Sequence, residues 1–211
     1  MTKIMTPSKM TTAGQIDKAV ANYRALLEKH SRDFNTEAVQ TVLGQTELAG
    51  EQFAVFRQRV KVVSNLIVNL IVRKVPVNRS RSSQEALDAT TRAQYTDRKV
   101  VDAMPKGEGD EAEIVFFKPD LSERNGFISD DHLEKEFDLR DLKPADPISV
   151  AAVNEADPTF ADQMPHGTHW KDAKGNWCFA AFSRWHGRRG VRAYCLGVVW
   201  NGRWWFAGVR K

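Results

Sequence analysis

The chain has 211 residues, of which 42% are hydrophobic, 27% charged and 9% aromatic, and its formal net charge is +4. This composition excludes a wholly disordered protein, and the length allows one large domain or two small ones. The start of the chain contains no apolar run long enough for a signal peptide, and its two cysteines are too few for a disulfide framework. We therefore expect a cytoplasmic protein.

The charge is unevenly distributed along the chain. Residues 1–51 are neutral, residues 52–84 carry a net charge of +7, residues 85–165 carry −11, and residues 166–211 carry +8. Blocks of opposite sign either pair inside the fold or bind separate partners. Internal pairing is the simpler interpretation, and a polyanion bound to a basic block is the alternative.

The N-terminal part is predicted to be helical. Residues 1–12 are expected to form a flexible tail, and residues 13–78 a helical region. Thr12 and Gln15 have the spacing of a capping box, and the apolar residues that follow recur three and four positions apart. A shorter helix is predicted to begin after Asn35.

The most apolar stretch, residues 47–74, is predicted to form one long and mostly buried helix. In its most apolar part, residues 61–75, the uninterrupted apolar runs are only three residues long, so a membrane-spanning helix is not expected. Polar side chains recur at steps of four along one narrow stripe: Arg57, Lys61, Asn65, Asn69 and Arg73. Because β-branched residues are frequent here, a pair of strands remains the alternative.

Residues 79–211 are predicted to form an α+β region. Ser82 and Ser129 are expected to cap short helices, and residues 113–118 to form a buried strand. A strand is predicted over residues 177–184, and the dipeptide Asn201-Gly202 is typical of a tight hairpin turn. The fold class is therefore α+β, with N-terminal helices, a mixed region and a C-terminal antiparallel meander.

A hairpin turning at Asn201-Gly202 would place Trp200 and Trp205 on one face together with Arg203. Burial in the core is the simpler role for most of the tryptophans. Cations among exposed rings, however, are typical of surfaces that hold single-stranded nucleic acid. The residues predicted to bind nucleic acid are Arg184, Arg188, Arg189, Arg192, Arg203, Arg210, Lys211, Trp200 and Trp205.

The main functional prediction is therefore a non-enzymatic protein that binds a polyanion, either RNA or single-stranded DNA, with no cofactor and no membrane contact. The first alternative is a protein-interaction or self-assembly module that uses the long apolar helix to bind a protein partner or to form a homo-oligomer.

The second alternative is an enzyme or metal site built from His166, His169, Cys178 and Cys195. Their spacing matches no compact zinc knuckle, and no catalytic residue or metal ligand is assigned. If the protein is exported, Cys178 and Cys195 could form a disulfide between neighbouring strands.

Overall fold

The computed structural model describes residues 11–68, 70–119, 121 and 124–211. The chain has the predicted α+β fold class. It divides into two compact units, which we call the helical unit, ending at Val68, and the sheet unit, beginning with strand β1.

The helical unit begins with the predicted capping box. The Thr12 hydroxyl accepts a hydrogen bond from the Gln15 amide at 3.3 Å, and the Gln15 side chain accepts one from the Thr12 amide at 2.9 Å. Asn35 caps the second α-helix, as predicted. No described side chain of this unit is buried. Its elements are α1 (Ala13–Lys29), η1 (Ser31–Asp33), α2 (Thr36–Leu43) and α3 (Leu48–Val68).

The prediction of one buried helix over residues 47–74 was wrong in two respects. Helix α3 ends at Val68, and Leu70–Pro76 forms strand β1, which pairs antiparallel with β3. The β-branched residues at the end of the stretch therefore join a sheet. Most of the described apolar side chains of α3 are exposed, with Phe53 at 61% and Val55 at 66%, and none of them is buried.

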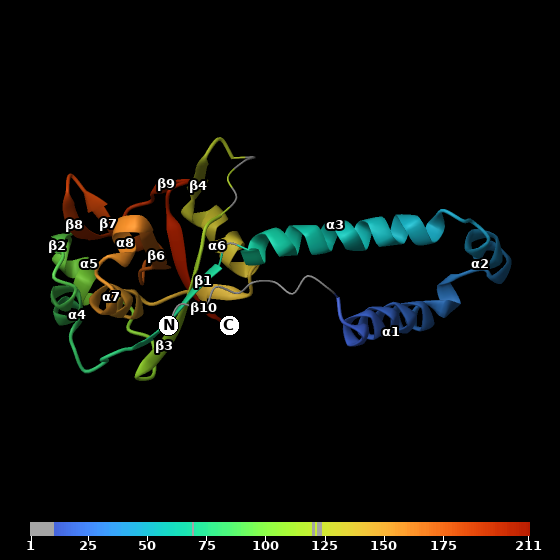
Figure 1. Cartoon of the computed structure of the whole chain (residues 1–211), viewed down its shortest axis with the longest axis horizontal. Helices are drawn as coiled ribbons and strands as arrows, with labels where there is room; N and C mark the ends of the chain where they lie inside the picture. The colour runs from blue at the N-terminus through green and yellow to red at the C-terminus, as the bar shows by residue number, and fades with distance from the viewer. Residues whose placement is uncertain (1–10, 69, 120, 122–123) are drawn as a thin grey trace. The chain divides into compact units, whose positions relative to one another are not determined.

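The sheet unit contains one large mixed sheet (Figure 1). Its strand order is β1-β3-β10-β6-β7-β8-β2, and β5 also pairs with β10. Strand β6 is parallel to β10, and β2 is parallel to β8, while the other pairs are antiparallel. The remaining bounds are β2 (Ala93–Thr96), β3 (Glu111–Phe117), β5 (Leu142–Pro144), β6 (His166–Lys171), β7 (Trp177–Trp185), β8 (Arg188–Tyr194) and β10 (Trp205–Arg210).

Each face of the sheet is packed against a different layer. One layer buries Leu87, Val101, Ile148 and Phe160, which come in that order from helices α4 (Ser83–Ala89), α5 (Arg98–Asp102), α7 (Pro147–Ala156) and α8 (Phe160–Gln163). The other layer buries Leu133 and Phe137 from helix α6 (Asp130–Asp138), together with a small ribbon of β4 (Phe127–Ser129) and β9 (Val199–Asn201). Ser82 and Ser129 cap α4 and α6 as predicted.

The end of the chain differs from the predicted hairpin. Asn201-Gly202 lies in a turn, since the Trp204 amide donates to the Asn201 carbonyl at 3.2 Å. Strand β9 nevertheless pairs with β4, while β10 lies between β3 and β6, so the predicted register was wrong. The predicted antiparallel arrangement holds for β6, β7 and β8.

Strands β7 and β8 are joined by a tight turn at His186 and Gly187. Both residues have positive φ, at 46° and 78°, as a type I′ hairpin requires. Cys178 and Cys195, at the other end of the same two strands, form a disulfide. Among the described residues, no helix has the length and apolarity that crossing a membrane would require.

Candidate nucleic-acid interface

The β7–β8 hairpin separates its arginines between the two faces of the sheet. Trp185 pairs with Arg188, and Arg184 pairs with Arg189. Because side chains alternate along a strand, Arg188 and Arg192 share the face of Trp185, while Arg184 and Arg189 share the opposite face. Two arginines adjacent in sequence therefore have different environments.

The arginines on the α8 side are paired with a carboxylate from the acidic part of the chain. Nε of Arg189 lies 2.9 Å from an oxygen of Asp162, and Nη1 of Arg184 lies 3.8 Å from the same oxygen. The Asp162 side chain is only 13% exposed. These two predicted nucleic-acid ligands thus contribute to the internal pairing of opposite charge blocks.

Three more of the predicted residues also have partners inside the protein. Nζ of Lys211 lies 2.7 Å from Asp138, and this hydrogen bond raises the pKa of Lys211. Trp200 is buried and donates from Nε1 to Asp130 at 3.0 Å. Trp205 is partly buried against the core on the α7 side. The rings of Trp200 and Trp205 therefore belong to the packed interior.

Two other aromatic rings are exposed beside the arginines of the opposite face. Trp185 is 54% exposed, and its ring centroid lies 3.5 Å from the guanidinium carbon of Arg192. Tyr95, 47% exposed, lies on the edge strand β2 directly opposite Arg192. Gly190 leaves room for the Tyr95 ring, because a Cβ at that position would lie 3.3 Å from it.

Arg203 adds a third cation to this region. Its guanidinium carbon lies 5.2 Å from the Trp204 ring. Burial lowers the pKa of Arg192, and the charge of the neighbouring Arg203 acts in the same direction. Within the described part of the chain, no ion pair involves Arg188, Arg192 or Arg203. We call the set of Tyr95, Trp185, Arg188, Arg192 and Arg203 the basic aromatic face.

Sequence reasoning found the three arginines of this face but missed both rings. Trp185 could have been found from strand alternation, because it lies three residues before Arg188 across a two-residue turn. Tyr95 gave no such signal, since the parallel pairing of β2 with β8 joins segments almost a hundred residues apart. Arg210 is exposed at the end of β10, outside the basic aromatic face.

The histidines and cysteines of the alternative metal site do not converge. His166 and His169 lie three positions apart on β6 and so project to opposite faces. The Nδ1 atom of His166 donates to the Met164 carbonyl, its Nε2 accepts from Asn154, both at 2.8 Å, and burial lowers its pKa to about 3.

The two cysteines lie close to Asp172, whose carboxylate is a group that can ligate a metal ion. Ligand atoms of Asp172, Cys178 and Cys195 lie within 4.8 Å of one another. Both sulfur atoms, however, are used by the disulfide. In this state the cluster offers a metal ion no thiolate ligand.

No family model matches the chain, and comparisons with curated proteins and with solved structures find no significant match. A functional interpretation therefore depends on the residues themselves.

Proposed function

We propose that this protein binds single-stranded nucleic acid, RNA or DNA, on its basic aromatic face. The observation that carries the proposal is the juxtaposition of two exposed rings, Trp185 and Tyr95, with arginines that have no carboxylate partner among the described residues. Such a surface can bind phosphates through its guanidinium groups and stack bases on its rings.

The chemistry of the face favours an anionic ligand over an internal role. Arg192 and Arg203 are close enough for each charge to disfavour the other, which a bound phosphate would relieve. Flat ring surfaces accept any base, so we expect little sequence preference. Strand β2, which carries Tyr95, forms one edge of the sheet.

The hairpin offers a closely matched test. Arg188→Gln/Arg192→Gln removes two charges from the basic aromatic face, and Arg184→Gln/Arg189→Gln removes two charges from the opposite face of the same strands. Binding of a fluorescein-labelled 12-nucleotide single strand is measured by anisotropy at several salt concentrations. Since each phosphate contact on a single strand contributes about 0.7 to the salt slope, losing two contacts should weaken binding about 20-fold near 0.1 M salt.

The control pair should change the dissociation constant less than about twofold, because its arginines already interact with Asp162. Equal losses for the two double variants would show that only net charge matters and would contradict the proposal. Trp185→Ala should independently weaken binding by about 1–3 kcal/mol, the contribution of one stacked base. Phe127→Ala, which removes a ring with 53% exposure from β4, is the matching control.

A second candidate function is self-assembly through the helical unit. Thirteen large apolar side chains of this unit are exposed: Ile16, Val20, Tyr23, Leu26, Leu27, Phe34, Val42, Leu43, Phe53, Val55, Phe56, Val60 and Val63. Half-exposed side chains of this size leave on the order of 1,000 Å² of apolar surface in water, comparable to one side of a stable interface. A second copy of the chain offers the same surface, and helices from two copies can close into a bundle.

Helix α1 provides the variants that test this candidate. Val20→Glu/Leu27→Glu places charges on the apolar stripe, and Ala21→Glu/Ala25→Glu places the same charges on the opposite side of the helix. Sedimentation velocity should find a concentration-dependent oligomer for the parent and for the alanine-site variant, and a monomer for the stripe variant. A parent that stays monomeric at high concentration would exclude self-assembly.

A further inference from the structure

The sheet unit contains a cavity of about 1000 Å³ at the place where β5 and β6 separate. Strand β10 pairs with β6 through Trp205 and Phe206 and with β5 through Gly208 to Arg210, so the two neighbours diverge beyond this point. Apolar groups from several strands line the cavity, including Ala112, Pro144, Trp170 and Val209. Its volume lies at the upper end of the range typical of small-molecule sites.

His169 is one of the residues that border this cavity, and a hydrogen bond fixes the orientation of its buried imidazole. Its Nδ1 lies 3.1 Å from Oδ1 of the buried Asp130. The same carboxylate accepts hydrogen bonds from Trp200 Nε1 at 3.0 Å and from the Val198 amide at 3.1 Å. Burial disfavours the charge of Asp130, but these hydrogen bonds outweigh it and hold the pKa of Asp130 below its ordinary value.

The other ring nitrogen of His169, Nε2, lacks a hydrogen-bond partner within the described part of the chain. An ionised carboxylate can only accept, so Nδ1 of a neutral His169 carries the proton and Nε2 is a bare acceptor. Nε2 is buried and makes no hydrogen bond among the described residues. An unpaired acceptor in a low-dielectric wall is unfavourable unless something binds to it, so its presence here requires an explanation.

Aromatic rings hold the imidazole on both sides. Trp177 stacks on it with ring centroids 4.5 Å apart and planes within 9°, and Phe137 stacks at 5.5 Å. The Trp177 indole also lines the cavity and donates to the exposed Asp131 at 2.9 Å. The His169 side chain is shielded from solvent, so a ligand that binds Nε2 has to displace one of the side chains packed around the imidazole.

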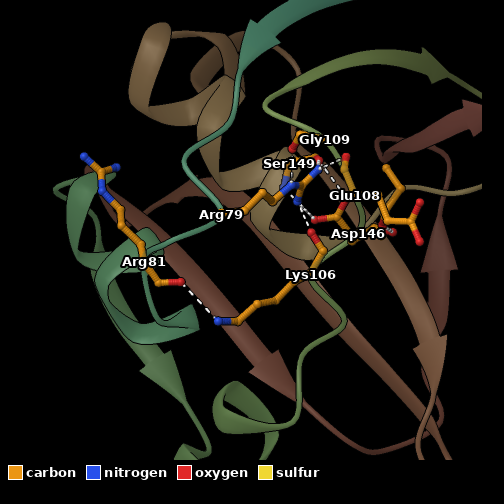
Figure 2. Close-up of polar contacts among 9 residues, drawn as sticks. Arg79, Arg81, Lys106, Glu108, Gly109, Asp146 and Ser149 are labelled. Carbon is orange, nitrogen blue, oxygen red and sulfur yellow. Dashed lines mark hydrogen bonds and ion pairs between the residues drawn. The ribbon is translucent and has the colours of Figure 1, made fainter.

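The charged groups of the cavity wall are largely satisfied by the protein. Arg79 uses its guanidinium nitrogens on the Asp146 carboxylate, the Ser149 hydroxyl and the carbonyls of Lys106, Glu108 and Gly109 (Figure 2). Two other wall carboxylates, Glu111 and Glu134, pair with Lys74 and Lys171. Within the described ranges, four charged residues of the wall make no ion pair, and they are two acids and two bases: Glu108, Glu113, Lys143 and Arg210.

We propose that this cavity binds a small uncharged organic molecule whose hydroxyl or N–H group donates a hydrogen bond to Nε2 of His169. The apolar groups of the wall accommodate the body of the ligand, and the balanced charges select against a strongly anionic or cationic one. Asp130 acts as a positioning residue, because it sets which imidazole nitrogen accepts. The site is separate from the basic aromatic face, so either proposal can fail without the other.

Phenol and anisole are the probes, since both have an aromatic ring but only phenol has a donor. The full-length protein is labelled with ¹⁵N-histidine, and the Nε2 resonance of His169 is followed during titration. We expect the unprotonated Nε2 in the parent, a saturable shift of its resonance with phenol, and no comparable shift with anisole. Nε2 observed as the protonated nitrogen, or a resonance indifferent to phenol, would overturn the proposal.

His169→Phe keeps a ring between Trp177 and Phe137 and removes the acceptor. Calorimetry should find that phenol binds this variant at least fivefold more weakly than the parent, while the affinity for anisole changes less than twofold. Equal phenol affinity for parent and variant would contradict a role for Nε2. If the variant does not fold, the tautomer and titration measured on the parent decide the question alone.

Discussion

Phenylalanines have opposite environments in the two units of this protein. In the sheet unit Phe116, Phe117, Phe182 and Phe206 are completely buried. In the helical unit Phe34, Phe53 and Phe56 are 49%, 61% and 53% exposed. The same residue type thus forms a core in one unit and an apolar surface in the other.

The difference shows that local sequence signals suffice to form a helix but not to bury it. Helices α1 and α2 have well-formed caps, yet neither contains a buried residue. In the sheet unit, two layers pack against the two faces of one sheet and bury the apolar positions of both. The sheet unit therefore has a packed core that stabilises it, whereas the described apolar side chains of the helical unit are left mostly exposed.

The largest expected change in stability comes from replacing one phenylalanine in each unit by alanine. Phe182→Ala should lower the free energy of unfolding by about 3–5 kcal/mol, because it leaves a cavity in a packed core. Phe53→Ala should change it by less than about 0.5 kcal/mol in dilute protein. Urea unfolding followed by circular dichroism measures both. Similar losses for the two variants would mean that the helical unit has a core of its own.

Acid should destabilise the protein through a buried group of the sheet unit. Burial lowers the pKa of His166 to about 3, while the unfolded chain binds the proton near its ordinary value of 6.5. The free energy of unfolding should therefore decrease as the pH falls from about 6.5 towards 3, by up to about 1.4 kcal/mol per pH unit. Urea unfolding followed by tryptophan fluorescence measures this slope, since all tryptophans lie in the sheet unit.

His166→Leu is the control for this slope. The variant should show little pH dependence between pH 6.5 and about 4, whatever its stability at neutral pH. Below about pH 4 the free energy of unfolding of the variant should still decrease. The pKa of Asp130 is lowered in the folded protein, so the stabilisation from its ionised carboxylate is lost as that group becomes protonated. An unchanged slope in the variant would show that His166 is not the group responsible.

A smaller difference in stability is expected between substitutions at two arginines of the same basic block, residues 52–84. Arg79→Gln should lower the free energy of unfolding by about 1–3 kcal/mol, because it leaves the part-buried acceptors of Asp146 and Ser149 without this donor. Arg57→Gln, at an exposed position of α3, should change stability by less than about 0.5 kcal/mol. Thermal unfolding measures the stability of both variants. A large loss of stability for Arg57→Gln would contradict the exposed position of this residue on α3.

The elements with local signals were predictable. Helix starts at Thr12, Asn35, Ser82 and Ser129 follow from side chains that cap neighbouring backbone amides. The buried strand predicted over residues 113–118 corresponds to β3, since a short apolar run is typical of a strand covered on both faces.

The candidate sites were less predictable because they depend on strand order. The arginines of the basic aromatic face could be named from the sequence, but Tyr95 joins them only through the parallel pairing of β2 with β8. The hydrogen bond between Asp130 and His169 likewise joins a helix to a strand 39 residues later.

The sequence by itself determined the fold class, the capped helices and the uneven distribution of charge, because these depend on neighbours along the chain. The tertiary structure decided which arginines pair with Asp162, which tryptophans are buried and which imidazole nitrogen lacks a partner. Those outcomes depend on side-chain alternation combined with the order in which distant strands pair, and a one-residue change of register would reverse each of them.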